Sequence, residues 1–239
     1  MDLLKPINVG PVRIDAPVIL APMTGVTDLP FRRMVKRYGA GLTVSEMIAS
    51  EAMIRETRQS LQKSLWDPAE EPVSLQLAGC EPQVMAEAAK LNEQRGAAII
   101  DINMGCPVRK VVNGDICSIE DSREALRQSG ADGVMIGRGA YGRPWLIGQV
   151  MSELSGGGHR PEPSLDEQLA AMLDQYDDML RLYGTQTGVN LARKHIGWYT
   201  KGLPGSAELR NTINQQAEPE VVVRMLQDFY APWLARSAA

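Results

Sequence analysis

Between residues 16 and 140, short apolar runs alternate with helix-like segments, and this alternation restricts the possible folds most. Chains of this kind form a parallel sheet whose strands are joined by right-handed helical crossovers. We therefore expect an α/β fold, with a helix capped by Thr27 and another capped by Ser118. The expected strands are 16–23, 42–47, 72–77, 97–100 and 133–136, and the expected helices are 27–39, 82–95 and 118–130. The run 97–100 is continuously apolar, which predicts a strand covered on both faces.

The pattern changes at the Ser-Gly-Gly-Gly run of residues 155–158, which reads as a linker. Beyond it we find no strand pattern. Ser164 precedes a segment with apolar residues at helical spacing, and further helices are expected near 188–201, 206–216 and 219–230. The sequence thus predicts a domain at 1–150, a linker at 151–160 and a helical bundle at 161–239.

Composition excludes several classes of protein. No apolar run approaches the length of about 18 residues that a membrane span needs, and the N-terminus lacks a secretion signal, so a cytoplasmic location is expected. Three cysteines, two histidines and no Cys-x-x-Cys motif favour reduced thiols and argue against a metal site. The net charge of −4 means that a nucleic-acid partner would need a local basic patch.

Cys106 lies in the segment Asp-Ile-Asn-Met-Gly-Cys-Pro of residues 101–107, where a buried strand is expected to end. In α/β proteins such strand ends carry the chemistry. A thiol there can act as a nucleophile or a proton donor. The alternative is a buried cysteine that serves as a small apolar side chain.

Other strand ends carry groups suited to a ligand with a ring and a phosphate. Met23 can lie against a flat apolar ring, and the amide of Gln76 can pair with a ring edge that offers both a donor and an acceptor. The alternatives are core packing for Met23 and a backbone contact for Gln76. The candidates for a phosphate are two glycine-containing turns, which could also be ordinary turns: Asn113, Gly114 and Asp115, and Gly137 and Arg138.

A basic stretch near residue 195 gives a candidate surface for RNA. At helical pitch one side carries Arg193, Lys194, Trp198 and Lys201, and the other carries Ala192, Ile196 and Tyr199. Cations with an interleaved aromatic suit a folded RNA through phosphate contacts and stacking. The alternative is a solvated helix face, and we expect His195 to be structural rather than catalytic.

In this order the motifs resemble those of the tRNA-dihydrouridine synthases, most closely the B-type bacterial subgroup. The resemblance rests on the segments 16–32, 72–79, 101–110, 113–145 and 192–198, and most specifically on Asn-Met-Gly-Cys-Pro at 103–107 and Arg-Gly-Ala-Tyr-Gly-Arg-Pro-Trp at 138–145. It implies a TIM-barrel domain that binds FMN, followed by a helical domain that binds tRNA. The implied activity is the reduction of uridine to 5,6-dihydrouridine in tRNA with NADPH.

The resemblance also implies roles for individual residues. Cys106 would be the general acid that protonates uracil C5 after hydride reaches C6. Pro22, Met23, Thr24 and Gln76 would contact the flavin. Its phosphate would be held by Asn113, Gly114, Asp115, Gly137 and Arg138, and the tRNA would lie on Arg193, Lys194, Trp198 and Lys201.

The chain departs from this family in length. A complete barrel takes roughly 250 residues, whereas the domain expected here has about 150 and five clear strands. About three β/α units are missing where Val111 and Val112 now stand, and with them the family's strand-end lysine and a histidine near the flavin. We expect an incomplete barrel whose exposed sheet edges favour self-association.

Two alternatives to an active synthase stay open at this stage. The chain could be a catalytically inactive remnant that still binds tRNA through its helical part. It could also be another flavin oxidoreductase on a barrel, which the basic helix disfavours because a small-molecule reductase has no need of it.

Overall fold

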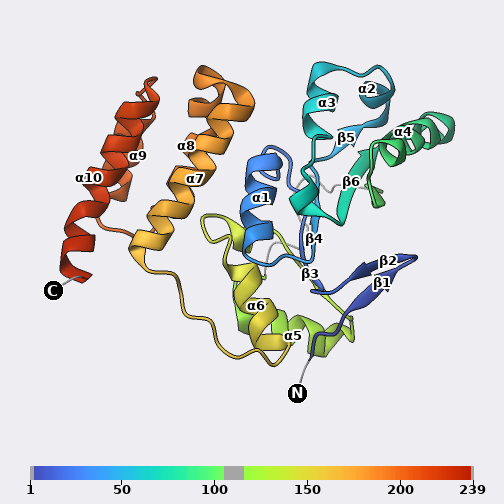
Figure 1. Ribbon diagram of the computed structural model, residues 1–239, viewed down its shortest axis with the longest axis horizontal. Helices are drawn as coiled ribbons and strands as arrows, with labels where there is room; N and C mark the ends of the chain where they lie inside the picture. Colours follow the sequence, from blue (N-terminus) through green and yellow to red (C-terminus); the bar gives the residue numbers. More distant parts are fainter. Residues whose placement is uncertain (1–2, 105–115, 238–239) are drawn as a thin grey trace. The chain divides into compact units, whose positions relative to one another are not determined.

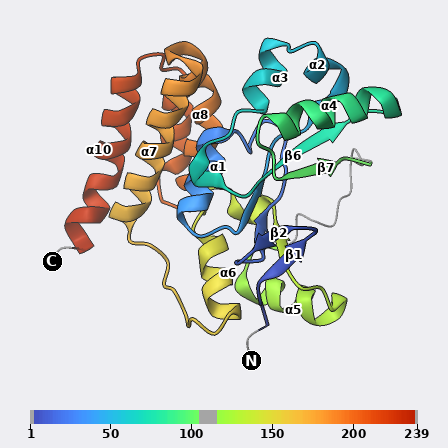
Figure 2. The same cartoon turned by 45° about the vertical axis from the view of Figure 1, so that its right-hand side comes forward.

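The computed structural model describes residues 3–104 and 116–237 and divides into two compact units (Figures 1 and 2). The first comprises Met1–Ala140 and Pro144–Arg160, and the second comprises Tyr141–Arg143 and Pro161–Ala239. The predicted boundary at residue 150 falls inside helix α6 (Leu146–Leu154). This helix packs on strand β3 (Val18–Leu20) and buries Leu146, Ile147, Val150 and Leu154, which ties it to the first unit.

A six-stranded parallel sheet forms the centre of the first unit, as the alternating pattern predicts. Its main path runs β5-β6-β4-β3-β8, and β7 pairs with β6. The other strands are β4 (Leu42–Val44), β5 (Ile48–Ala49), β6 (Val73–Ala78), β7 (Ile99–Ile102) and β8 (Val134–Ile136). All five expected strands are present, several of them shorter than expected, and β5 is an addition.

Strands β7 and β8 follow one another among the described strands, yet they pair with opposite parts of the sheet. β7 pairs with β6, whereas β8 pairs with β3. The expectation that 97–100 forms a strand covered on both faces is wrong, because β7 is only partly buried and Ile102 at its end is 53% exposed. Within the described residues β6 is the one strand that pairs with β7, which explains this exposure.

Helices connect the strands of the first unit much as expected. They are α1 (Leu29–Arg37), α4 (Pro82–Gln94) and α5 (Ile119–Ser129), with α4 beside β6 and β7 in Figure 2. Ser118 caps α5 as predicted, and Gly130 ends it with φ of 66°. The cap of α1 is Asp28, not Thr27, and its carboxylate accepts a hydrogen bond of 3.1 Å from the Phe31 amide.

The sequence pattern does not reveal several short elements of the first unit. They are the hairpin of β1 (Ile7–Val9) and β2 (Val12–Ile14), the helices α2 (Ser50–Ile54) and α3 (Arg58–Lys63), and the 3₁₀ turn η1 (Pro68–Glu70). Helix α3 and the turn η1 lie in the connection between β5 and β6.

The second unit contains the helices α7 (Leu165–Tyr183), α8 (Thr185–Tyr199), α9 (Ser206–Ile213) and α10 (Pro219–Ser237). Residues 161–237 hold no strand, in line with the sequence pattern. A capping box of Ser164 and Glu167 starts α7, which packs against α8 and α10 (Figure 1). Among the described residues, no helix has the length and apolar run that crossing a bilayer requires.

Candidate functional site

The carboxyl ends of β3 and β8 bring two predicted groups of site residues together. The strands run parallel in register, and directly after them the Ala21 amide donates a hydrogen bond of 2.9 Å to the Ile136 carbonyl. Pro22, Met23 and Thr24 therefore follow one strand where Gly137 and Arg138 follow its neighbour. Gly137 is buried, whereas Arg138 and Thr24 are exposed.

The backbone of Met23 is fixed by the buried side chain of Thr27. The hydroxyl of Thr27 accepts a hydrogen bond of 3.0 Å from the Met23 amide and donates one of 3.3 Å to the Met23 carbonyl. Backbone amides of Val26 and Thr27 also donate to this carbonyl. The loop after β3 is thus a closed turn rather than an open connection.

Gln76 belongs to a polar cluster at the junction of β6 and β7. It lies within β6, two residues before the strand ends, and not at its tip as predicted. Asp101 is its register partner, so both side chains leave the sheet on the same face, and Gln76 Nε2 donates a hydrogen bond of 2.5 Å to Asp101 Oδ2. Asn103 Nδ2 lies 3.3 Å from Gln76 Oε1 and 3.3 Å from the sulfur of Met47.

Sequence reasoning did not select Asp101 and Asn103 as site residues. The signal was present, because residues two apart on a strand share a face and both directly precede the Gly-Cys-Pro motif. In the cluster Gln76 uses one amide hydrogen and one lone pair of its oxygen on these neighbours. Its amide keeps one further hydrogen and one further lone pair for a ligand.

The turn after β8 lies unusually close to another part of the chain. A Cβ at Gly139 would stand 2.2 Å from the carbonyl oxygen of Ile116 and 3.0 Å from Cys117 Cα, so only glycine fits. This contact brings residues 116–117 against the turn that contains Arg138. Cys106, Asn113, Gly114 and Asp115 lie outside the described residues, and their roles stay predictions.

A basic pocket of about 790 Å³ lies between α8 and α9 of the second unit. All four residues predicted to contact RNA line it, together with Arg210. Arg193 is held in place by a hydrogen bond of 3.0 Å from Nη2 to the Gln216 carbonyl. The remaining lining residues are Asn190, Gly197, Asn211 and Asn214.

Trp198 lies at the edge of this pocket with one ring face already used. It stacks on Tyr141 with the ring centroids 4.0 Å apart and 17° between the ring planes. A nucleobase therefore cannot stack on that face of Trp198, and the ring also makes an edge contact with His195, with the ring centroids 5.0 Å apart. Ala192, Ile196 and Tyr199 are buried on the other side of α8, as the helical spacing predicts.

His195 is part of the core of the second unit, as expected for a structural residue. Its Nδ1 lies 3.0 Å from Gln175 Nε2, and Gln175 in turn accepts a hydrogen bond of 3.0 Å from the Tyr199 hydroxyl. Burial, with a smaller effect of Lys194, lowers the pKa of His195 to about 3. The ring is therefore neutral at physiological pH. Among the described residues no cluster of carboxylates, histidines and cysteines could hold a metal ion.

Comparison with known proteins identifies the family. The sequence profile described as "Dihydrouridine synthase (Dus)" matches residues 19–112 and 111–232. The chain belongs to this family. It is 38% identical to a probable tRNA-dihydrouridine synthase of Rickettsia bellii, over 96% of this chain and 99% of the relative. It is 33% identical to tRNA-dihydrouridine synthase B of Xanthomonas campestris and 30% identical to that of Pseudomonas aeruginosa, over at least 94% of each chain, which fits the B-type subgroup.

The alignment with the first of these relatives is longer than the chain itself, which agrees with the internal loss that the sequence analysis predicted. The alignment with the Rickettsia bellii protein spans 324 positions and this chain has 239 residues, so at least 85 positions have no counterpart here. The profile matches in two pieces that meet at residues 111–112, which places the loss between β7 and α5. The synthase family is one of oxidoreductases, and the parallel sheet fits its barrel-like domain.

Proposed function

We propose that this chain is, by descent, an FMN-dependent tRNA-dihydrouridine synthase that reduces uridine to 5,6-dihydrouridine with NADPH. The observation that carries the proposal is the Gln76 cluster of β6 and β7, which belongs to the same sheet that aligns Met23 with Gly137 and Arg138. The relatives are described as tRNA-dihydrouridine synthases, which points to tRNA as the substrate. A tRNA substrate agrees with the expected cytoplasmic location.

The described residues fit a flavin mononucleotide. The unused hydrogen and lone pair of the Gln76 amide suit the donor–acceptor edge of the flavin's pyrimidine ring. Pro22, Met23 and Thr24 would lie along the ring, and Gly137 and Arg138 would hold the phosphate with Asn113, Gly114 and Asp115. When bound, reduced FMN supplies the hydride that uracil receives at C6.

Cys106 would complete the addition of hydrogen across the C5–C6 bond. Its thiol gives a proton to C5 as the C5–C6 π-bond electrons move to that carbon, and the resulting thiolate regains a proton from solvent. The target base must leave the tRNA stack to reach such a site. Because the flavin would deliver hydride from one face of the base, the thiol has to lie on the opposite face.

We further propose that the first unit is a TIM barrel from which three β/α units are missing. The positions of β7 and β8 support this, since they pair with opposite parts of the sheet although they follow one another among the described strands. The exposure of Ile102 and of Met104, which is 94% exposed, matches surfaces that further strands would cover in a complete barrel. Self-association through these edges is part of this proposal.

The second candidate function is that of a tRNA-binding remnant without catalysis. The absence of the family's lysine and histidine and the exposure of β7 favour it. The basic pocket would then be the functional part of the chain, with phosphate contacts from Arg193, Lys194, Lys201 and Arg210.

Absorbance of the purified protein separates the two candidates. A flavin absorbance peak at about 450 nm supports the synthase candidate, although we expect FMN to bind weakly without the family's lysine. If synthase activity is present, Cys106→Ala should lower turnover by roughly 10²–10⁴-fold and leave FMN affinity unchanged. Cys80→Ala and Cys117→Ala are matched controls that should retain activity. Full turnover of the Cys106 variant removes the thiol from the mechanism.

A salt titration tests the RNA-binding part. Three or four phosphate contacts predict weak binding whose log K falls with log salt at a slope of about −2 to −4. Replacing Arg193, Lys194 and Lys201 together with alanine should flatten the slope and weaken binding of all tRNAs alike. Arg181→Ala with Arg224→Ala is the control, since both are exposed cations that do not line the pocket. Equal binding by the triple variant and the parent refutes the assignment of this pocket.

A further inference from the structure

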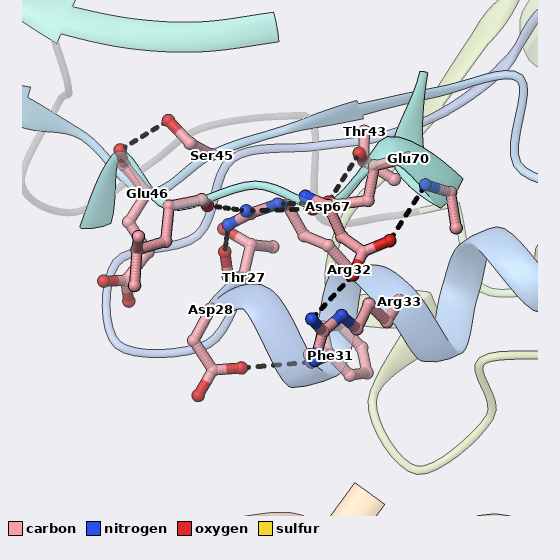
Figure 3. A network of polar contacts seen from close by, with 12 residues as sticks. Thr27, Asp28, Phe31, Arg32, Arg33, Thr43, Ser45, Glu46, Asp67 and Glu70 are labelled. Carbon is pink, nitrogen blue, oxygen red and sulfur yellow. Dashed lines mark hydrogen bonds and ion pairs between the residues drawn. The ribbon is translucent and has the colours of Figure 1, made fainter. Parts of the chain in front are cut away.

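A buried ion pair lies on the helix side of β4, outside the residues assigned to the site so far (Figure 3). Arg32 of α1 and Glu70 of η1 are 1% and 0% exposed at their side chains. Arg32 Nε donates a hydrogen bond of 2.7 Å to Glu70 Oε1, and Nη2 lies 3.4 Å from Oε2, so the contact is bidentate. The pair joins segments that are 38 residues apart in the sequence.

Both partners also hold backbone and side-chain groups of the surrounding loops. Arg32 Nη2 donates a hydrogen bond of 2.6 Å to the Leu65 carbonyl, and Glu70 Oε2 accepts one of 3.0 Å from the Asp67 amide. The Thr43 hydroxyl of β4 donates one of 3.3 Å to Glu70 Oε1. The connection between α3 and β6 is thereby fixed to α1 and to the sheet.

The ion pair reaches the flavin-contact loop through Thr27. Arg32 Nη1 donates a hydrogen bond of 2.8 Å to the Thr27 carbonyl, and the Thr27 hydroxyl binds the amide and the carbonyl of Met23. We propose that Glu70, Arg32 and Thr27 are positioning residues that hold the Met23 backbone in the conformation in which it contacts the flavin. This role rests on the proposed function, because it assumes that Met23 faces FMN.

The chemistry of the pair favours positioning over stabilisation. Desolvation of two buried charges offsets most of their attraction, so such a pair contributes little net stability compared with apolar side chains of equal size. A guanidinium has fixed donor directions, and here they reach Glu70, the Leu65 carbonyl and the Thr27 carbonyl at once. An apolar replacement could fill the volume but could not fix the direction of the Thr27 carbonyl.

Thr27→Val tests the last link of this chain with little change of volume. The variant removes the one side-chain acceptor of the Met23 amide and leaves the bond from Arg32 to the Thr27 carbonyl and the backbone bonds to the Met23 carbonyl. Thr43→Val is the matched control. It also removes a fully buried hydroxyl from the same network, but that hydroxyl binds Glu70 and not Met23. Thr27→Ser keeps the hydroxyl and serves as the rescue variant.

Three measurements on the full chain decide the question: hydrogen exchange at the Met23 amide without flavin, FMN affinity from fluorescence quenching, and the melting temperature. We expect both valine variants to melt at similar, modestly lower temperatures. Only in Thr27→Val should the Met23 amide exchange about tenfold faster than in the parent, and only this variant should bind FMN about tenfold more weakly. Tenfold is the size expected for the loss of one buried hydrogen bond. Thr27→Ser should behave like the parent.

Two results would overturn the inference. One is unchanged Met23 exchange in Thr27→Val, and the other is an equal loss of FMN affinity in Thr43→Val, which would reduce the effect to general stability. If the parent itself takes up no FMN, the proposed function fails, but the exchange comparison still shows whether Thr27 fixes Met23. The two failures are therefore distinguishable.

Discussion

Acid should destabilise the second unit through one residue, His195. In the folded protein its pKa is lowered to about 3, while the same side chain in the unfolded chain keeps a value near 6.5. Between these two values the unfolded state binds the proton and the folded state does not. The contribution of His195 to stability is therefore complete above about pH 6.5 and is lost as the pH falls toward 3.

The size of the effect follows from the shift. Each pH unit below about 6.5 costs roughly 1.4 kcal/mol, so the free energy of unfolding should fall by about 2 kcal/mol between pH 8 and pH 5. Carboxylates with a lowered pKa, such as Asp67 and Asp121, titrate mostly below this window. The range from pH 5 to 8 thus isolates the histidine.

Urea unfolding at several pH values, followed by circular dichroism, measures this dependence. His195→Gln should flatten the pH dependence of stability, since glutamine does not titrate and can still form a hydrogen bond with Gln175. His159→Gln is the matched control, because His159 is the other histidine of the chain and its side chain is 72% exposed. If the parent keeps its stability down to pH 5, or if both variants share its slope, the argument from burial is wrong.

Three further outcomes follow from backbone geometry, a cap and an exposed edge. Gly142→Ala should destabilise the second unit by more than about 2 kcal/mol in urea unfolding, because its φ is 67° and a Cβ would lie 2.4 Å from the backbone of α8. Gly205→Ala, with φ of 81° in the left-handed helical region and a Cβ at an ordinary 3.6 Å from the Phe229 ring, should cost only about 1 kcal/mol, and equal losses would contradict the steric reason. Ser164→Ala should cost about 1 kcal/mol of helix stability, because the capping box is lost. An unchanged melting curve would show that this cap does not stabilise α7. Replacing Ile102 and Met104 with lysine should reduce self-association in sedimentation experiments, and a parent that sediments as a monomer refutes the edge proposal.

Local patterns were sufficient to predict the sheet and most helices, because apolar spacing and caps are properties of neighbouring residues. The cap of α1 was misassigned to Thr27 because two adjacent residues, Thr27 and Asp28, both have cap chemistry. The choice depends on a contact that only the fold supplies, since the Thr27 hydroxyl is already bound to Met23.

Burial of β7 could not be predicted from its own residues. A run of alanine and isoleucine fits the centre of a parallel sheet, but its cover depends on strands that other parts of the chain must supply. Within the described residues only β6 pairs with β7, so the run forms a partly exposed strand instead. The prediction failed at the place where the chain differs from its relatives.

The candidate site shows the same division between local and long-range information. Gln76 and the groups after β3 and β8 were selected as candidates because the sequence pattern placed them at strand ends, although Gln76 lies within β6. The ion pair of Arg32 and Glu70 was missed, because charges 38 residues apart give no sequence signal until the fold brings them together.

The topology explains which part of the site the internal loss affects most. β3 and β8 are neighbours, so the loop of Met23 and the turn of Arg138 are aligned although at least 85 positions of a relative have no counterpart in this chain. The Gln76 cluster belongs to β6 and β7, where its members Asp101 and Asn103 are only half-buried. Water can approach that side of the cluster and compete for the remaining hydrogen and lone pair of the amide. Under the proposed function, the phosphate contacts should therefore contribute most of the affinity for FMN, and the ring contacts should be the weaker part.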